Sequence, residues 1–216
     1  MCNSSYKIIT KIIANRIKKF LPEIILENQG GFVPNRQIID NILAVQEALH
    51  SSMLKKESGI IIKLDMANAF DRVSLPYLTA VLKKFGFSND IIDVISACIM
   101  GPWIASLING RPSDFFQSFL SPFLYMIMAY SLSRDLEKSR RERTLTGLHI
   151  SYGVRSINNS LSTNDTLLIG GASCIIAQRF KKVPNKFMEV SGGLFNNAKC
   201  RIYGWNAPSR TMQRIS

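Results

Sequence analysis

The stretch IIIKLDMANAFD, Ile60 to Asp71, decides how this chain folds. An aliphatic run ends at a carboxylate, Asp65, which is the pattern of a buried strand with an acid at its end. About a hundred residues later, Asn164 and Asp165 precede a second apolar run, 167–169. Carboxylates that meet at strand ends can hold divalent metal ions against a phosphate. The sequence therefore predicts that Asp65 and Asp165 converge in space.

Helices and strands are expected to alternate on both sides of this strand. Apolar residues recur at helical spacing in several segments, and short apolar runs bounded by turn residues indicate strands. The pair Asn109-Gly110 is typical of a hairpin. All elements surround one apparent core, so we expect a single α+β unit with a mainly antiparallel sheet. The expected helices cover 6–21, 37–54, 75–85, 88–100, 121–138 and 174–188, and further strands lie near 103–108, 113–117, 148–152, 154–157, 166–169 and 201–203.

The first two helices carry specific expectations about packing. The helix over 6–21 is amphipathic, and Pro22 is expected to end it. Its basic face carries no acid and is either a solvated surface or a contact for a phosphate backbone. Its apolar stripe consists of Ile8, Ile9, Ile12, Ile13, Ile17, Phe20 and Leu21, and the stripe expected to be buried in the next helix consists of Ile38, Ile39, Ile42, Leu43, Val45 and Leu49.

The composition is that of a folded, basic protein. Of the 216 residues, 46% are hydrophobic, which supplies a core and excludes a disordered chain. The net charge of +12 fits nucleic acid, an anionic membrane surface, or a merely soluble basic protein. Four scattered cysteines without a CxxC pair leave no recognisable zinc site. No signal peptide is recognised, and the longest apolar stretch, 119–132, is shorter than the about 20 residues that span a bilayer.

Six sequence blocks follow one another along nearly the whole chain. In this order they resemble the reverse transcriptase of a non-LTR (LINE-type) retrotransposon, of the sort abundant in plant genomes. A single block is weak support, whereas six in the family's order are highly specific. The blocks are a first helix ending in Leu-Pro at 21–22, NQGGFVPNRQ at 28–37, the stretch 65–73, the pair 107–110 and 120–124, LSTNDTLLIG at 161–170, and SGGLFNNAK at 191–199.

The resemblance implies a fingers-palm polymerase fold, with an antiparallel palm sheet packed with helices and the thumb absent. The chain would be a partial reverse transcriptase domain, fingers-like over about 1–60 and palm-like over about 60–216. Its implied activity is RNA-directed DNA polymerisation with two Mg²⁺ ions. The implied partners are an RNA template, a DNA primer and deoxynucleoside triphosphates, with no membrane. Members of this family insert their product into chromosomal DNA, which implies a nuclear location. The resemblance does not indicate an oligomeric state.

The resemblance also assigns roles to the acidic residues. Asp65 would ligate both metal ions, with the Met66 backbone carbonyl and Asp165 as further ligands. Hard Mg²⁺ prefers oxygen ligands, which explains carboxylates rather than His or Cys. Where the family has another Asp, this chain has Asn164, a neutral and weaker ligand. By analogy with removing one partner of a buried charged group, this costs about 3–5 kcal/mol, which is about a hundred- to several-thousand-fold in rate.

Three further residues are candidates for binding the nucleotide. Phe70 would stack under the sugar and exclude a 2′-hydroxyl, although its pattern alone favours a plain core aromatic. Arg36 would contact the triphosphate through its planar fork, or it caps the neighbouring helix. Lys199 would lie close to the leaving pyrophosphate, or it is an ordinary exposed lysine.

The chain departs from the family in ways that bear on activity. Besides Asn164, the glycine-rich loop expected before Leu120 is missing, and no thumb, endonuclease, RNase H or zinc-knuckle segment is recognised. The sequence therefore favours a degenerate copy of the domain with weak or no activity. The alternatives are a non-catalytic RNA- or DNA-binding remnant and a fragment that never folds.

Overall fold

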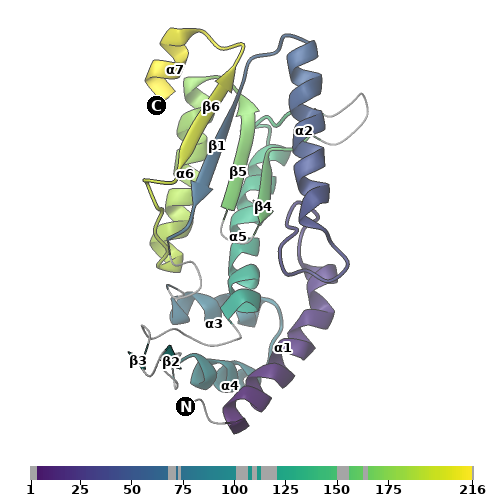
Figure 1. Ribbon diagram of the computed structural model, residues 1–216, viewed down its shortest axis with the longest axis vertical. Coiled ribbons are helices and arrows are strands. Elements are labelled where there is room, and N and C mark those ends of the chain that lie inside the picture. Colours follow the sequence, from purple (N-terminus) through teal and green to yellow (C-terminus); the bar gives the residue numbers. More distant parts are fainter. Residues whose placement is uncertain are drawn as a thin grey trace.

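Figure 1 shows a sheet with helices packed against it and a second group of helices at one end. The computed structural model describes residues 4–67, 72, 74–100, 107–108, 111–112, 121–149, 156–162 and 165–215. The four-stranded antiparallel sheet has the order β4-β5-β1-β6, and β2 and β3 form a separate pair. This confirms the expected α+β class. The elements are α1 (Ser4–Ile24), α2 (Ile38–Leu54), β1 (Gly59–Asp65), α3 (Leu75–Lys84), α4 (Asn89–Met100), β2 (Leu107–Ile108), β3 (Arg111–Pro112), α5 (Ser121–Arg141), β4 (Asn159–Ser162), β5 (Asp165–Gly171), α6 (Cys174–Ser191), β6 (Arg201–Trp205) and α7 (Ser209–Ile215).

The alternation of side chains along β1 determines which residues face the core and which face outward. Alternate residues of β1, starting with Ile60, pack into a core that α5 and α6 close on one face of the sheet (Figure 1). Phe180 of α6 is almost fully buried in this core. Lys63 and Asp65 belong to the other alternate set, so they point to the opposite face.

A small apolar cluster covers part of the opposite face of the sheet. There, Val45 of α2 packs with Ile169 of β5 and with the indole of Trp205. The indole lies so close to Gly59 that a Cβ at that position would be 2.0 Å from the ring. This cluster reaches from the start of β1 to Leu167, and Asp65 beyond it is partly exposed.

A second core joins the helices below the sheet. It is built from α1, α3, α4 and the first half of α5, with Leu21, Leu82 and Ile95 fully buried. The expectation that Pro22 ends the first helix was wrong, because α1 continues to Ile24. A proline in the last turn removes only its own bond to the preceding turn, and the amide of Ile25 still donates to the Leu21 carbonyl at 2.9 Å.

The expected apolar stripes of the first two helices are largely exposed. In α2 the buried residues are Val45, Ala48 and Ser52, which lie three and four positions apart on one narrow face. Small residues on that face let the helix approach the sheet, so the bulkier aliphatic residues lie elsewhere on its surface. The exposed residues that the sequence placed in the two stripes are Ile8, Ile9, Ile12, Phe20, Ile38, Ile39, Ile42 and Leu43.

The remaining elements fill in the expected pattern with two additions. The strand β4 and the short helix α7 were not expected. The hairpin around 109–110 is confirmed by the pairing of Ile108 with Arg111. Of the strands expected near 148–152 and 154–157, the described residues show a bridge between Leu148 and Ile157. The segments 103–106, 113–117 and 150–155 lie outside the described residues. None of the described helices is long and apolar enough to cross a bilayer.

Candidate active site

The two carboxylates singled out from the sequence face each other across the central strands. Asp65 ends β1 and Asp165 begins β5, and the antiparallel register makes them direct partners. Residues so placed have Cβ atoms about 4.5–5.5 Å apart. Both are partly exposed. The convergence expected from the sequence is therefore confirmed, at the end of the ladder between β1 and β5.

A lysine that sequence reasoning passed over reaches into this carboxylate pair. Lys63 precedes Asp65 by two positions and so shares its face of the strand. Its Nζ lies 3.0 Å from Oδ2 of Asp165, and the two side chains are 37% and 42% exposed. The hydrogen bond and charge of Asp165 raise the pKa of Lys63, with a smaller contribution from Asp65. The signal that could have found it is the Lys-x-Asp spacing on a strand.

A loop behind β1 fixes the backbone of Asp65. The amide of Asn196 donates to the Asp65 carbonyl at 2.9 Å, and the Asp65 amide donates to Sγ of Cys200 at 3.5 Å. The amide of Ala67 donates to the Leu194 carbonyl at 2.9 Å. These bonds hold the family-like SGGLFNNAK segment against the strand end.

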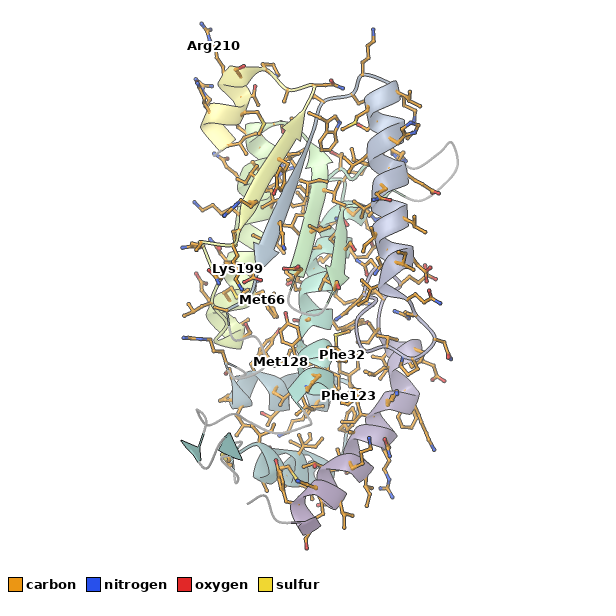
Figure 2. All side chains as sticks on the ribbon, in the orientation of Figure 1. Phe32, Met66, Phe123, Met128, Lys199 and Arg210 are labelled. Atoms are coloured by element: carbon orange, nitrogen blue, oxygen red, sulfur yellow. The ribbon has the colours of Figure 1, made fainter. Side chains whose placement is uncertain are left out.

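Lys199 belongs to the same loop and is exposed. Figure 2 places Lys199 near Met66, at the end of β1 where the carboxylates meet. Lys199 comes two residues before Arg201, which pairs with Lys63 near this end of β1.

Met66 anchors the residue next to the carboxylate. It is 5% exposed, and its sulfur accepts a hydrogen bond from the hydroxyl of Tyr125 on α5. Burial raises the pKa of Tyr125, so this hydroxyl keeps its proton. The side chain of Met66 is therefore buried in the core, and only its backbone carbonyl is a candidate metal ligand.

Arg36 is occupied by the protein's own backbone. Its guanidinium donates to the carbonyls of Pro22, Ile25, Leu26 and Gln29 at 2.6 to 3.1 Å. These carbonyls lie at and just beyond the end of α1, so Arg36 caps that helix. This is the second of the two roles that the sequence allowed for Arg36. A contact with a triphosphate would require these bonds to break.

Two of the expected site residues lie outside the described residues, Phe70 and Asn164. Thr163 and Asn164 both lie outside the described residues, and the pairing of Ser162 of β4 with Asp165 of β5 is described on either side of them. The segment between β3 and α5, where the family's glycine-rich loop is missing from this sequence, also lies outside the described residues.

A cavity at the other side of the sheet's edge strand is separate from the carboxylate pair. It measures about 660 Å³ and lies between the end of α1, α2, α5 and β4. Among its described lining residues, Asn28, Asn41 and Asn159 each have a buried amide atom with no protein partner. Such a polar, roomy cavity suits ordered water. Neither Asp65 nor Asp165 lines it.

The model of the family described as reverse transcriptase (RNA-dependent DNA polymerase) matches residues 1–209 of this chain. The chain belongs to the reverse transcriptase family. A further relative is the Transposon TX1 uncharacterized 149 kDa protein of Xenopus laevis, which is 34% identical over 92 residues. That match covers 43% of this reverse transcriptase chain and only 7% of the transposon protein.

Solved reverse transcriptase-like structures agree with the fold. The apo telomerase from Candida tropicalis, truncated from the C-terminal domain, matches with a TM-score of 0.61 at 16% identity, covering 93% of this chain and 41% of that one. The telomerase from Candida albicans in complex with a TWJ fragment of telomeric RNA matches with a TM-score of 0.61 at 15% identity. That match covers 90% of this chain and 35% of the telomerase chain. At these identities the likeness shows the fold alone. The chain spans less than half the length of these relatives.

The carboxylate pair suits the divalent metal ions that reverse transcriptases normally use. Asp65 and Asp165 offer hard oxygen donors on one accessible face, which is the donor type that Mg²⁺ prefers. Within the described ranges, no group of three or more His, Cys, Asp or Glu comes together. The described residues therefore supply two carboxylates at this place, and one of them, Asp165, forms an ion pair with Lys63.

Proposed function

We propose that this chain is the RNA-directed DNA polymerase domain of a non-LTR retroelement, with Asp65 and Asp165 as its metal-binding pair. The observation that carries the proposal is the direct register pairing of these two carboxylates in a chain of the reverse transcriptase family. In this arrangement both carboxylates are partly exposed, so a nucleic acid could approach them. The proposed plant-type ancestry rests on the sequence blocks.

The proposed site divides its tasks among a few residues. Asp65 and Asp165, with the Met66 carbonyl, would hold two Mg²⁺ ions. Bound magnesium would activate the primer 3′-hydroxyl and steady the leaving pyrophosphate. Lys199, exposed at the same end of the sheet, would attract the triphosphate through its positive charge. Phe70 would stack on the sugar.

Arg36 is assigned to the fold rather than to the nucleotide. All of its hydrogen bonds run to backbone carbonyls near the end of α1. It therefore ties the proposed fingers-like part, about 1–60, together. The proposed palm-like part, about 60–216, carries the sheet and both carboxylates.

The proposed partners are an RNA template, a DNA primer and deoxynucleoside triphosphates. Nucleic acid as a partner is supported by the family and by the net charge of +12. The proposed site of action is the nucleus, where such a polymerase would meet chromosomal DNA.

We further propose that this copy is catalytically impaired. Asn164 removes a negative charge beside Asp165, and the glycine-rich loop of the family is missing from the sequence. The test is single-nucleotide addition to a DNA primer on an RNA template, followed over long times with Mg²⁺ or Mn²⁺. The expected result is slow addition that D65N abolishes. Processive synthesis would refute the impairment, and addition that D65N leaves unchanged would refute the site.

A second candidate function is a non-catalytic nucleic-acid-binding remnant. It is favoured by the ion pair between Lys63 and Asp165, because a carboxylate that already holds an ammonium group is a poorer metal ligand. In that case RNA binding would depend on salt, and no nucleotide would be added with either metal. The same single-nucleotide assay therefore separates the two candidates.

A further inference from the structure

The ion pair between Lys63 and Asp165 lies inside the carboxylate pair, not beside it. Lys63 and Asp65 share one face of β1, and Asp165 is the direct partner of Asp65 on β5. Lys63 itself is opposite Leu167, so its side chain reaches diagonally along the ladder to Asp165, where Nζ lies 3.0 Å from Oδ2. The ammonium group therefore occupies one oxygen that a divalent cation would take.

The other groups around Lys63 do not compete for this position. On β6 its direct partner is Arg201, whose guanidinium donates to the carbonyls of Ala198 and Cys200. Among the ion pairs of the described residues, the one with Lys63 is the only one that includes Asp65 or Asp165. Lys63 is thus the cation that the protein itself supplies to the pair.

Two directly opposed carboxylates need such a cation. Like charges opposite each other on neighbouring strands destabilise the ladder, and a single positive charge between them reduces that repulsion. A divalent cation would do the same, but an ammonium group bound at Oδ2 competes for that oxygen's lone pairs and repels the metal's charge. The two cations are therefore alternatives.

We propose that Lys63 is a built-in counter-ion that competes with the divalent metal, so that metal binds the pair only when Lys63 leaves Asp165. Lys63 is a positioning residue in this scheme, because it acts through Asp165. The inference rests on the proposed function in one respect, namely that the carboxylate pair is the metal site.

The experiment measures metal binding directly, without catalysis. Mn²⁺ is titrated into the full chain, and free Mn²⁺ is followed by electron paramagnetic resonance. Lys63→Met keeps most of the side-chain length and removes the charge, whereas Lys63→Arg keeps the charge. Lys55→Met is the matched control, because Lys55 is exposed just beyond α2, near the opposite end of β1 from Asp65.

Lys63→Met is expected to bind Mn²⁺ about tenfold more tightly than the unchanged chain, because one competing and repelling charge at short range is gone. Lys63→Arg is expected to stay near the unchanged value, and Lys55→Met to have no effect. In the background of Asp165→Asn, Lys63→Met should give much less gain, which a double-mutant cycle measures as a coupling between the two residues. Circular dichroism and urea unfolding check that each variant is folded.

The failures of the two proposals are distinguishable. If Asp65→Asn or Asp165→Asn weakens Mn²⁺ binding but Lys63→Met does not change it, the counter-ion proposal is overturned and the metal site stands. If neither carboxylate variant alters Mn²⁺ binding, the pair is not the metal site, and both proposals are overturned. A gain in Lys63→Met that persists fully in the Asp165→Asn background also overturns the counter-ion proposal.

Discussion

Asp65 on β1 lies directly opposite Asp165 on β5, at the end of an antiparallel ladder that begins with Gly59 and Gly171. The position concentrates negative charge where the strands stop pairing. A core made only for stability would not place two acids opposite each other. The pair is tolerated because both side chains are partly exposed and because Lys63 reaches Asp165. This is the arrangement expected of a site that awaits a cation.

The first prediction is that Asp65→Asn stabilises the metal-free chain. The change removes the repulsion between the carboxylates but leaves the ion pair between Lys63 and Asp165 in place. Because Asp65 is partly exposed and the side chain of Asp165 is 42% exposed, the gain is small, about 0.5 kcal/mol. Urea unfolding in the presence of a chelator measures it. Asp165→Asn, which also removes the ion pair, should give a smaller gain or none, and a loss of more than about 1 kcal/mol in Asp65→Asn would contradict the repulsion argument.

The second prediction concerns Arg36. Replacing it with Met should destabilise the chain by about 2–4 kcal/mol, because several backbone carbonyls near the end of α1 lose a charged donor. Burial lowers the pKa of Arg36, which is consistent with a guanidinium partly withdrawn from water. Arg36→Lys should recover only part of the loss, since one ammonium group cannot reach all four carbonyls.

The control for this second prediction is Arg16→Met. Arg16 is exposed on α1, so its replacement should change the free energy of unfolding by less than about 0.5 kcal/mol. Equal losses for the two variants would show that Arg36 does not act through the hydrogen bonds. A thermal or urea unfolding series of the three variants is sufficient.

Much of the sheet could be predicted because its signals are local. The run that ends at Asp65 and the run that follows Asp165 are short, aliphatic and bounded by turn residues. Their pairing followed from the family resemblance and from the chemistry of two acids. The strand β4 was missed because the sequence Asn159–Ser162 carries three polar residues. Long-range backbone pairing places it in the sheet, because β4 pairs with β5 and Leu161 forms a bridge with Gln29.

The packing faces of α1 and α2 could not be predicted because both helices are apolar over too much of their surface. In α2, Ile38 and Ile39 are as hydrophobic as any core residue, yet they are 44% and 52% exposed. The close approach of Ala48 to the sheet decides the orientation, and small residues give a weak signal in a hydrophobicity pattern. Lys63 was missed for a different reason. Its ion pair with Asp165 depends on the register between β1 and β5, which joins residues about a hundred positions apart in the sequence.

The third prediction concerns Asn164. Asn164→Asp should tighten Mn²⁺ binding, because it adds a carboxylate next to Asp165 in the sequence. It should not restore processive synthesis by itself, since the missing glycine-rich loop is a separate defect. Mn²⁺ titration and single-nucleotide addition on an RNA template measure the two effects. Full synthesis in Asn164→Asp would show that the loop is dispensable, and unchanged Mn²⁺ binding would place position 164 away from the metal.

The fourth prediction decides between a solvated surface and a nucleic-acid contact for the basic face of α1. Lys7, Lys11 and Lys18 are exposed on this helix, and no acid lies among them in the sequence. If they contact phosphates, replacing all three with Ala should reduce the slope of log affinity against log salt by about 2–3. RNA binding by fluorescence anisotropy at several salt concentrations gives the slope.

The matched control for α1 uses three exposed basic residues of α6, Lys181, Lys182 and Arg179, replaced in the same way. The two triple variants lose the same formal charge, so any long-range effect of net charge is equal in both. A reduced slope only in the α1 variant would locate the RNA beside the lower helices of Figure 1, on the side where the sheet ends at Asp65. Equal slopes in both variants would mean that α1 is a solvated face, and that the net charge of +12 attracts RNA without a fixed contact there.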